Sequence, residues 1–62
     1  MTGKEVAGAA LKNDTVMWNG GKYACVGYKR IVDKHKGIID SAILKDERGI
    51  LYDVLIREVT EK

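Results

Sequence analysis

The chain has few of the residues that usually stabilise a protein of this size. Its 62 residues include one cysteine, one histidine, no proline and no phenylalanine. A single cysteine excludes a disulfide within the chain, and Cys25 and His35 supply only two of the four ligands that structural zinc takes. A domain this short buries only about 60% of its unfolded surface. We therefore expect no metal and no cofactor, and we expect self-association or docking on a protein partner to add stability.

Long apolar runs and catalytic motifs are also missing. No segment approaches the roughly 20 apolar residues of a membrane span, and the N-terminus lacks the pattern of a secretory signal. Gly20-Gly21 is not followed by the remaining residues of a P-loop, and the carboxylates show no spacing typical of an acid–base pair. The unpaired Cys25 suits a reducing compartment. These features predict a cytoplasmic, non-enzymatic protein with no membrane partner and no small-molecule substrate.

The N-terminal segment has the pattern of a short helix. Thr2 and Glu5 have the spacing of a capping box, and Val6, Ala9 and Ala10 fall on one helical face. Asn13 is a residue that can end a helix in the left-handed conformation. A helix over residues 3–12 is predicted, and its small side chains suit close packing on a sheet.

The rest of the chain reads as strands joined by short polar turns. Strands are predicted over residues 15–18, 22–32, 38–44 and 50–56, with 57–59 either continuing the last strand or forming a fifth. Asn19-Gly20 favours a type I′ hairpin turn. Gly27 indicates a bulge or bend, and strict alternation groups Tyr28 with Ala24 and Val26, opposite Cys25.

Together these elements define a mainly β (α+β) fold in a single domain of residues 1–62. The expected architecture is the helix at about 3–12 plus a four- or five-stranded curled antiparallel meander over 15–59. At this size an SH3-like small barrel is the common solution, because closure removes exposed strand edges. The last residues, 60–62, are expected to fray.

Basic residues gather in the middle of the chain. Between positions 22 and 36, five Lys or Arg residues stand against one Asp, and three aromatic residues lie nearby. The candidate partner- or nucleic-acid-binding residues are Lys22, Lys29, Arg30, Lys34, His35, Lys36, Trp18, Tyr23 and Tyr28. This segment is the strongest functional candidate in the sequence.

Three interpretations of this segment remain open. The first is a binding module for a protein partner or for itself as a homo-oligomer, since Trp, Tyr and Arg anchor interfaces; a bacterial or phage accessory protein would fit. The second is nucleic-acid binding through residues 22–36, with cations on phosphates and aromatic rings stacked on bases. The pI of about 8.8 is low for a dedicated nucleic-acid binder. The third is a solvated polar loop without a partner.

Overall fold

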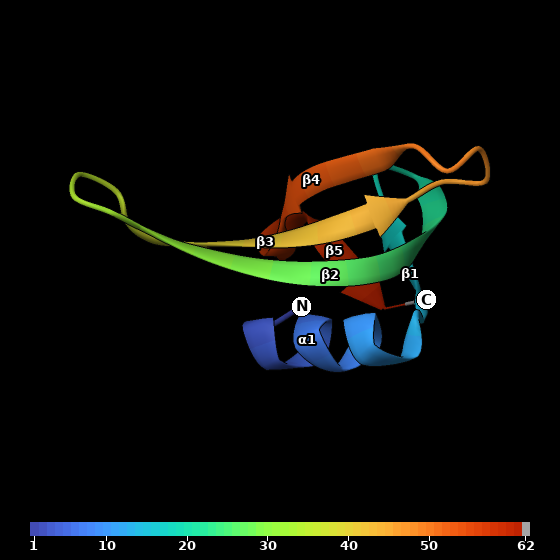
Figure 1. Cartoon of the computed structure of the whole chain (residues 1–62), viewed down its shortest axis with the longest axis horizontal. Helices are drawn as coiled ribbons and strands as arrows, with labels where there is room; N and C mark the ends of the chain where they lie inside the picture. The colour runs from blue at the N-terminus through green and yellow to red at the C-terminus, as the bar shows by residue number, and fades with distance from the viewer. Residues whose placement is uncertain (62) are drawn as a thin grey trace.

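The computed structural model describes residues 1–61 as one helix and one five-stranded antiparallel sheet (Figure 1). The elements are α1 (Gly3–Lys12), β1 (Thr15–Trp18), β2 (Gly21–Asp33), β3 (Gly37–Lys45), β4 (Leu51–Leu55), the 3-10 turn η1 (Ile56–Glu58) and β5 (Val59–Glu61). The strand order is β4-β3-β2-β1-β5, so the last strand returns to pair with the first. The predicted mainly β, curled meander is confirmed.

The predicted closure of the sheet into a small barrel is not observed. Among the described residues β4 pairs only with β3, and β5 pairs only with β1, so the sheet curls without closing. Helix α1 lies along one side of the sheet and contacts β2 and β3 (Figure 1). The helix therefore covers the core from the side of the central strands β2 and β3.

Local sequence explains the ends of α1. The Thr2 hydroxyl accepts a hydrogen bond from the Glu5 amide at 3.2 Å, and the Glu5 carboxylate accepts one from the Thr2 amide at 2.8 Å. That second bond is the main reason why the pKa of Glu5 lies below its usual value. Asn13 ends the helix with a φ of 54°, so the predicted helix and both of its caps are confirmed.

The Asn19-Gly20 turn and the bulge at Gly27 agree with the prediction, but Tyr28 lies on the other face of the sheet from the one predicted. Asn19 and Gly20 have φ of 49° and 78°, as a type I′ turn requires. The β2–β3 register shifts between Cys25 and Gly27. The shift adds one residue to β2, so Tyr28 lies on the face of Cys25 and not on that of Ala24, as strict alternation suggested. A side chain at position 27 would be crowded, because a Cβ atom there would lie 3.1 Å from Ile43 Cγ1.

The hydrophobic core lies between α1 and the sheet. Its buried apolar residues are Val6, Ala9, Val16, Cys25, Ala42, Leu44, Val54 and Val59. The small residues of α1 allow the helix to approach the strands closely, as its sequence predicts. Every core residue of β2 and β3 lies in the halves of these strands near α1, β1 and β4, so the far half of the hairpin has no core of its own.

The C-terminal segment differs from its predicted state. The residues after β4 form the turn η1 and then β5, in which Thr60 pairs with Met17 and Glu61 with Val16. The sheet thus extends beyond residue 59, and the prediction that Thr60 and Glu61 fray is wrong. The reason is that β1 has a free edge on the side away from β2, and β5 occupies it. Lys62, the last residue of the predicted frayed segment, lies outside the described residues.

Candidate functional site

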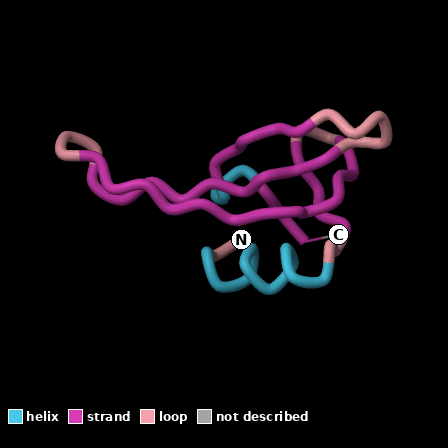
Figure 2. Tube along the Cα trace, viewed as in Figure 1, coloured by secondary structure: helices cyan, strands magenta, loops and turns pink. Residues whose placement is uncertain are grey.

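The far half of the β2–β3 hairpin projects from the molecule as a two-stranded arm (Figures 1 and 2). Its pairs run from Arg30 opposite Asp40 to Asp33 opposite Gly37, whereas the β3–β4 pairing ends at Ser41. We call residues 30–40 the hairpin arm and the remaining described residues the body. The arm accounts for the elongated shape, which measures 35 × 20 × 18 Å.

Apolar side chains of the hairpin arm face solvent. Val32 is 78% exposed, its cross-strand partner Ile38 is 61% exposed, and Ile31 is 44% exposed. Val32 and Ile38 continue the face that forms the core in the body, but they lie where no other element covers them. Exposed apolar groups framed by charged residues are typical of interaction surfaces.

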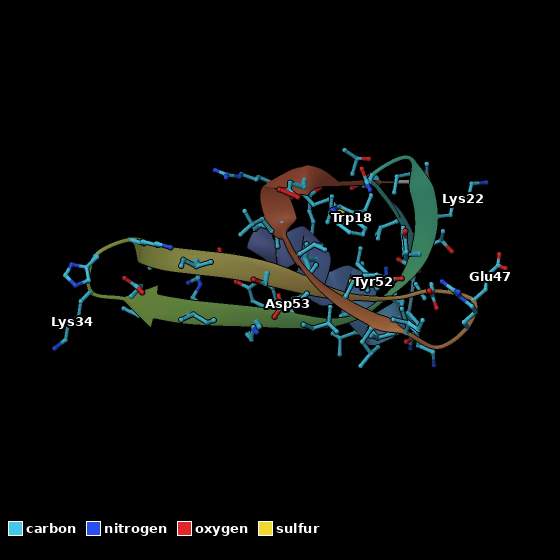
Figure 3. The ribbon with its side chains drawn as sticks, turned by 90° about the horizontal axis from the view of Figure 1, so that it is seen from above. Trp18, Lys22, Lys34, Glu47, Tyr52 and Asp53 are labelled. Carbon is cyan, nitrogen blue, oxygen red and sulfur yellow. The ribbon has the colours of Figure 1, made fainter. Side chains whose placement is uncertain are left out.

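A structured turn presents the basic end of the arm. One oxygen of Asp33 accepts hydrogen bonds from the amides of His35, at 2.7 Å, and Lys36, at 2.9 Å. These bonds hold the pKa of Asp33 below its usual value. The side chains of Lys34, His35 and Lys36, which we call the basic tip, are exposed, and Figure 3 shows Lys34 at the far end of the arm. None of the three forms an ion pair with another described residue.

The two basic residues at the root of the arm have carboxylate partners. Lys29 forms an ion pair with Asp53, and Arg30 Nε donates to Asp40 at 2.8 Å. Asp40 also accepts a hydrogen bond from the Tyr28 hydroxyl at 3.1 Å. Arg30 lowers the pKa of Asp40, and Lys29 lowers that of Asp53. The charges at this root are therefore largely neutralised, unlike those of the tip.

The aromatic residues gather elsewhere. Trp18, Tyr23 and Tyr52 form a cluster with ring centroids 5.5–5.7 Å apart. Trp18 is partly buried and packs against the core. The cluster lies in the body near Lys22, away from the arm end that carries Lys34 (Figure 3).

The residues proposed from the sequence are thus brought together only in part. Lys34, His35 and Lys36 share the tip, and Lys29 and Arg30 share the root. Trp18 and Lys22 lie toward the opposite end of the molecule (Figure 3), and Tyr23 contacts the Trp18 ring. Tyr28 packs against the core next to Gly3 of α1. A basic surface interleaved with stacking rings is not assembled.

The residue with intrinsic chemical reactivity is enclosed. Cys25 is fully buried, and its thiol lies 3.7 Å from the Val6 carbonyl oxygen, to which it donates. Burial raises the pKa of the Cys25 thiol, which disfavours the nucleophilic thiolate. His35 lies in the exposed tip, so the two do not meet. Residues 1–61 contain no group of three or more His, Cys, Asp or Glu side chains that could hold a metal ion.

Sequence reasoning missed a crevice beside the hairpin arm. It has a volume of about 500 Å³ and lies where β4 turns into η1. We call it the edge crevice; its lining residues are Lys36, Ile38, Ile39, Asp40, Leu55, Ile56 and Arg57. The crevice arises because β3 spans 9 residues and β4 only 5. The predicted strands 38–44 and 50–56 are equally long, so the sequence carried no signal for it.

Comparison with known proteins adds no relative. Family models, curated proteins and solved structures were all searched, and none matches this chain. Within residues 1–61, α1 is too short to cross a membrane, and no other α-helix is present.

Proposed function

We propose that this protein is a non-enzymatic binding module that recognises a protein partner through its hairpin arm. The observation that carries the proposal is the exposed cross-strand pair of Val32 and Ile38 on a ribbon with no covering layer. Isolated two-stranded ribbons are marginal in water and gain stability from a further strand or a packed face. A partner that covers this pair would supply that face.

The surroundings of the pair resemble the composition of a protein interface. Such interfaces have an apolar centre and a polar rim that remains accessible to water. On the arm, the aliphatic pair provides the centre, while Arg30 and the basic tip provide the rim. The buried state of Cys25 supports the non-enzymatic part of the proposal, and its lack of a disulfide partner is consistent with a cytoplasmic location.

The test is affinity capture from lysate of the source cell with matched variants. In the first variant, Val32→Thr and Ile38→Thr keep β propensity but remove apolar contact area. The control, Leu51→Thr, changes a 60% exposed aliphatic residue of β4 that lies outside the arm. Wild type and the control should capture the same protein, and the arm variant should lose most of it. Equal capture by all three would contradict the proposal.

Self-association through the same surface is a form of this proposal with a distinct signature. Folding linked to assembly makes the melting temperature rise with protein concentration. If the arm joins two copies, this rise should vanish in the variant with Val32→Thr and Ile38→Thr. A melting temperature that does not depend on concentration, with a monomeric mass by light scattering, would exclude self-association.

Nucleic-acid binding is the second candidate, favoured by one observation: the basic tip is exposed and without ion pairs among the described residues. Two or three phosphate contacts would give a log–log salt slope of about −2 to −3 on duplex DNA. Charge reversal by Lys34→Glu and Lys36→Glu should then abolish binding, while Lys4→Glu should not. A lack of DNA and RNA binding at about 50 mM salt would exclude this candidate.

A further inference from the structure

Both strand edges of the hairpin arm lack a neighbouring strand, and the edge of β3 is the one that adjoins the edge crevice. Residues Gly37–Asp40 of β3 pair with β2 on one side only, because the β3–β4 ladder begins at Ser41. The backbone hydrogen bonds of turns, loops and caps in residues 1–61 do not involve this segment either. Unpaired N–H and C=O groups in a row form a template for another strand.

The open edge continues the line of β4. That strand pairs with β3 up to Leu55 opposite Ser41, and the chain then turns away as η1. A strand added at Gly37–Asp40 would therefore extend the sheet along the path that β4 leaves. Four residues span about 13 Å at the usual rise of a strand.

The edge crevice lies directly beside this open position. Ile38, Ile39, Leu55 and Ile56 provide its apolar walls. Its volume of about 500 Å³ exceeds what one side chain fills and is within the range of ligand pockets. An added strand places alternate side chains on opposite faces, so aliphatic groups at every second position could enter it.

The charged residues that line the edge crevice indicate which side chains an added strand should carry. Lys36 and Arg57 lie at its lining and form no ion pair with any described residue. Asp40, the carboxylate of the lining, already accepts hydrogen bonds from Arg30 and Tyr28. Two uncompensated cations therefore face the incoming chain, which favours carboxylates there.

We propose that an extended segment of the partner protein, with alternating acidic and aliphatic residues, adds as a strand to the Gly37–Asp40 edge. This inference rests on the proposed function and names the segment recognised. Main-chain hydrogen bonds to β3 would supply affinity, and the apolar walls with Lys36 and Arg57 would supply specificity.

Labelled synthetic peptides test the inference directly. The probe is a six-residue peptide of alternating Glu and Val with blocked ends, and its control has Lys in place of Glu. Fluorescence anisotropy should show binding of the acidic peptide that weakens as salt rises, and binding of the Lys peptide at least about tenfold weaker. Equal binding of the two peptides would overturn the proposal.

Backbone pairing leaves a second signature. N-methylation of alternate peptide amides removes donors on one side of the strand only. Two peptides are compared, one methylated at the odd-numbered amides and one at the even-numbered amides. One of them should fail to bind and the other should bind, because only every second amide of an added strand faces its neighbour. Equal effects of the two methylation patterns would contradict strand addition.

Matched protein variants locate the site. Lys36→Glu with Arg57→Glu should weaken the acidic peptide at least about tenfold and improve the Lys peptide. The control, Lys4→Glu with Lys45→Glu, makes the same change of net charge at two exposed positions outside the crevice and should alter affinity less than twofold. If the control weakens binding as much as the test pair, the crevice is not the site.

The outcomes separate this inference from the proposed function. If neither peptide binds but the variant with Val32→Thr and Ile38→Thr still loses its captured partner, the strand-addition inference fails and the binding module stands. If the arm variant captures the partner as wild type does, the proposed function fails. A concentration-dependent melting temperature that Lys36→Glu with Arg57→Glu removes would assign the edge to a second copy, and would overturn the choice of partner.

Discussion

The body and the hairpin arm share two strands in one continuous ladder, yet the apolar pairs on the core face of that ladder differ in burial. In the body, Cys25 pairs with Leu44 and both are fully buried; in the arm, Val32 pairs with Ile38 and both are exposed. Hydrogen bonding is similar in the two halves. What differs is the covering layer, which α1 and the outer strands supply only to the body. Strand pairing therefore sets register, and a second layer decides burial.

The difference has energetic consequences. Burying one Leu or Val side chain contributes about 1.5–3 kcal/mol, and this contribution is available only to the body. The hairpin arm depends on continuation of the ladder from the body and on local contacts such as the Arg30–Asp40 pair, which is worth little where it is exposed. Four predictions examine this contrast.

The largest effect is expected from a cavity in the body. Leu44→Ala should lower the free energy of unfolding by about 2–5 kcal/mol, because Leu44 is fully buried and the surrounding core relaxes only partly into the cavity left by its side chain. Urea unfolding followed by Trp18 fluorescence measures this change. A loss below 1 kcal/mol would mean that the core does not stabilise the body as described.

The rate of amide hydrogen exchange should differ between the body half and the arm half of the β2–β3 ladder. Ladder amides near Cys25 and Leu44 should exchange at least about a hundredfold more slowly than those of residues 31–33 and 38–40. The reason is that the body opens by global unfolding, which costs roughly 3–5 kcal/mol in a domain this small, while the arm opens locally. Uniform protection along the ladder would remove the distinction between arm and body. Added acidic peptide should slow exchange at the Gly37–Asp40 edge.

Polar substitution on the arm should have little effect on folding. Val32→Thr and Ile38→Thr should each change the free energy of unfolding by less than about 0.5 kcal/mol, since the two side chains are already in water. Chemical unfolding of the purified variants measures this change. A loss above 1 kcal/mol would show that these side chains stabilise the free protein. That result would weaken the proposal that they are exposed in order to contact a partner.

The smallest effect concerns acid. Amide donors lower the pKa of Asp33 in the arm turn, and the Ile50 amide is the main cause of the lowered pKa of Asp46 in the β3–β4 turn. A carboxyl whose pKa is lower in the folded than in the unfolded protein stabilises the fold at pH values above its unfolded pKa, which is near 3.9. This stabilisation is lost as the pH falls through the folded pKa. The hydrogen bonds from backbone amides to these two carboxylates should therefore remain formed at pH 5 and weaken below about pH 4.

Amide shifts in an NMR titration measure this acid response for each turn. The His35 and Lys36 amides report on the arm, and the Ile50 amide reports on the body. Asp33→Asn should remove the response at His35 and leave that at Ile50. A turn that loosens as pH rises would have the wrong sign and would contradict the assignment.

The sequence predicted local structure well and spatial grouping poorly. Thr2 with Glu5, Asn13, and the Asn19-Gly20 pair each act through neighbours within a few residues, so their roles were readable. Gly27 indicated the bulge, but the effect of the bulge on the facing of Tyr28 depends on the β3 register, which is a long-range property. Trp18 precedes the basic segment and Lys34 lies within it, yet the 13-residue strand β2 separates the two residues in space. The edge crevice joins β3 to Leu55–Arg57, and no local pattern relates these segments.

The bulge between Cys25 and Gly27 has a consequence for how this molecule could be remodelled. Because β2 carries one residue more than β3 requires at this point, deletion of Val26 would restore one-to-one pairing and leave every later pair of the arm in register. The facing of Val32 and Ile38 would be preserved, while the extra bend and twist that a bulge adds would be lost. Val26 therefore affects the direction in which the arm points without changing which side chains the arm exposes. Deleting this one residue would give a protein whose arm carries the same surface in a different orientation.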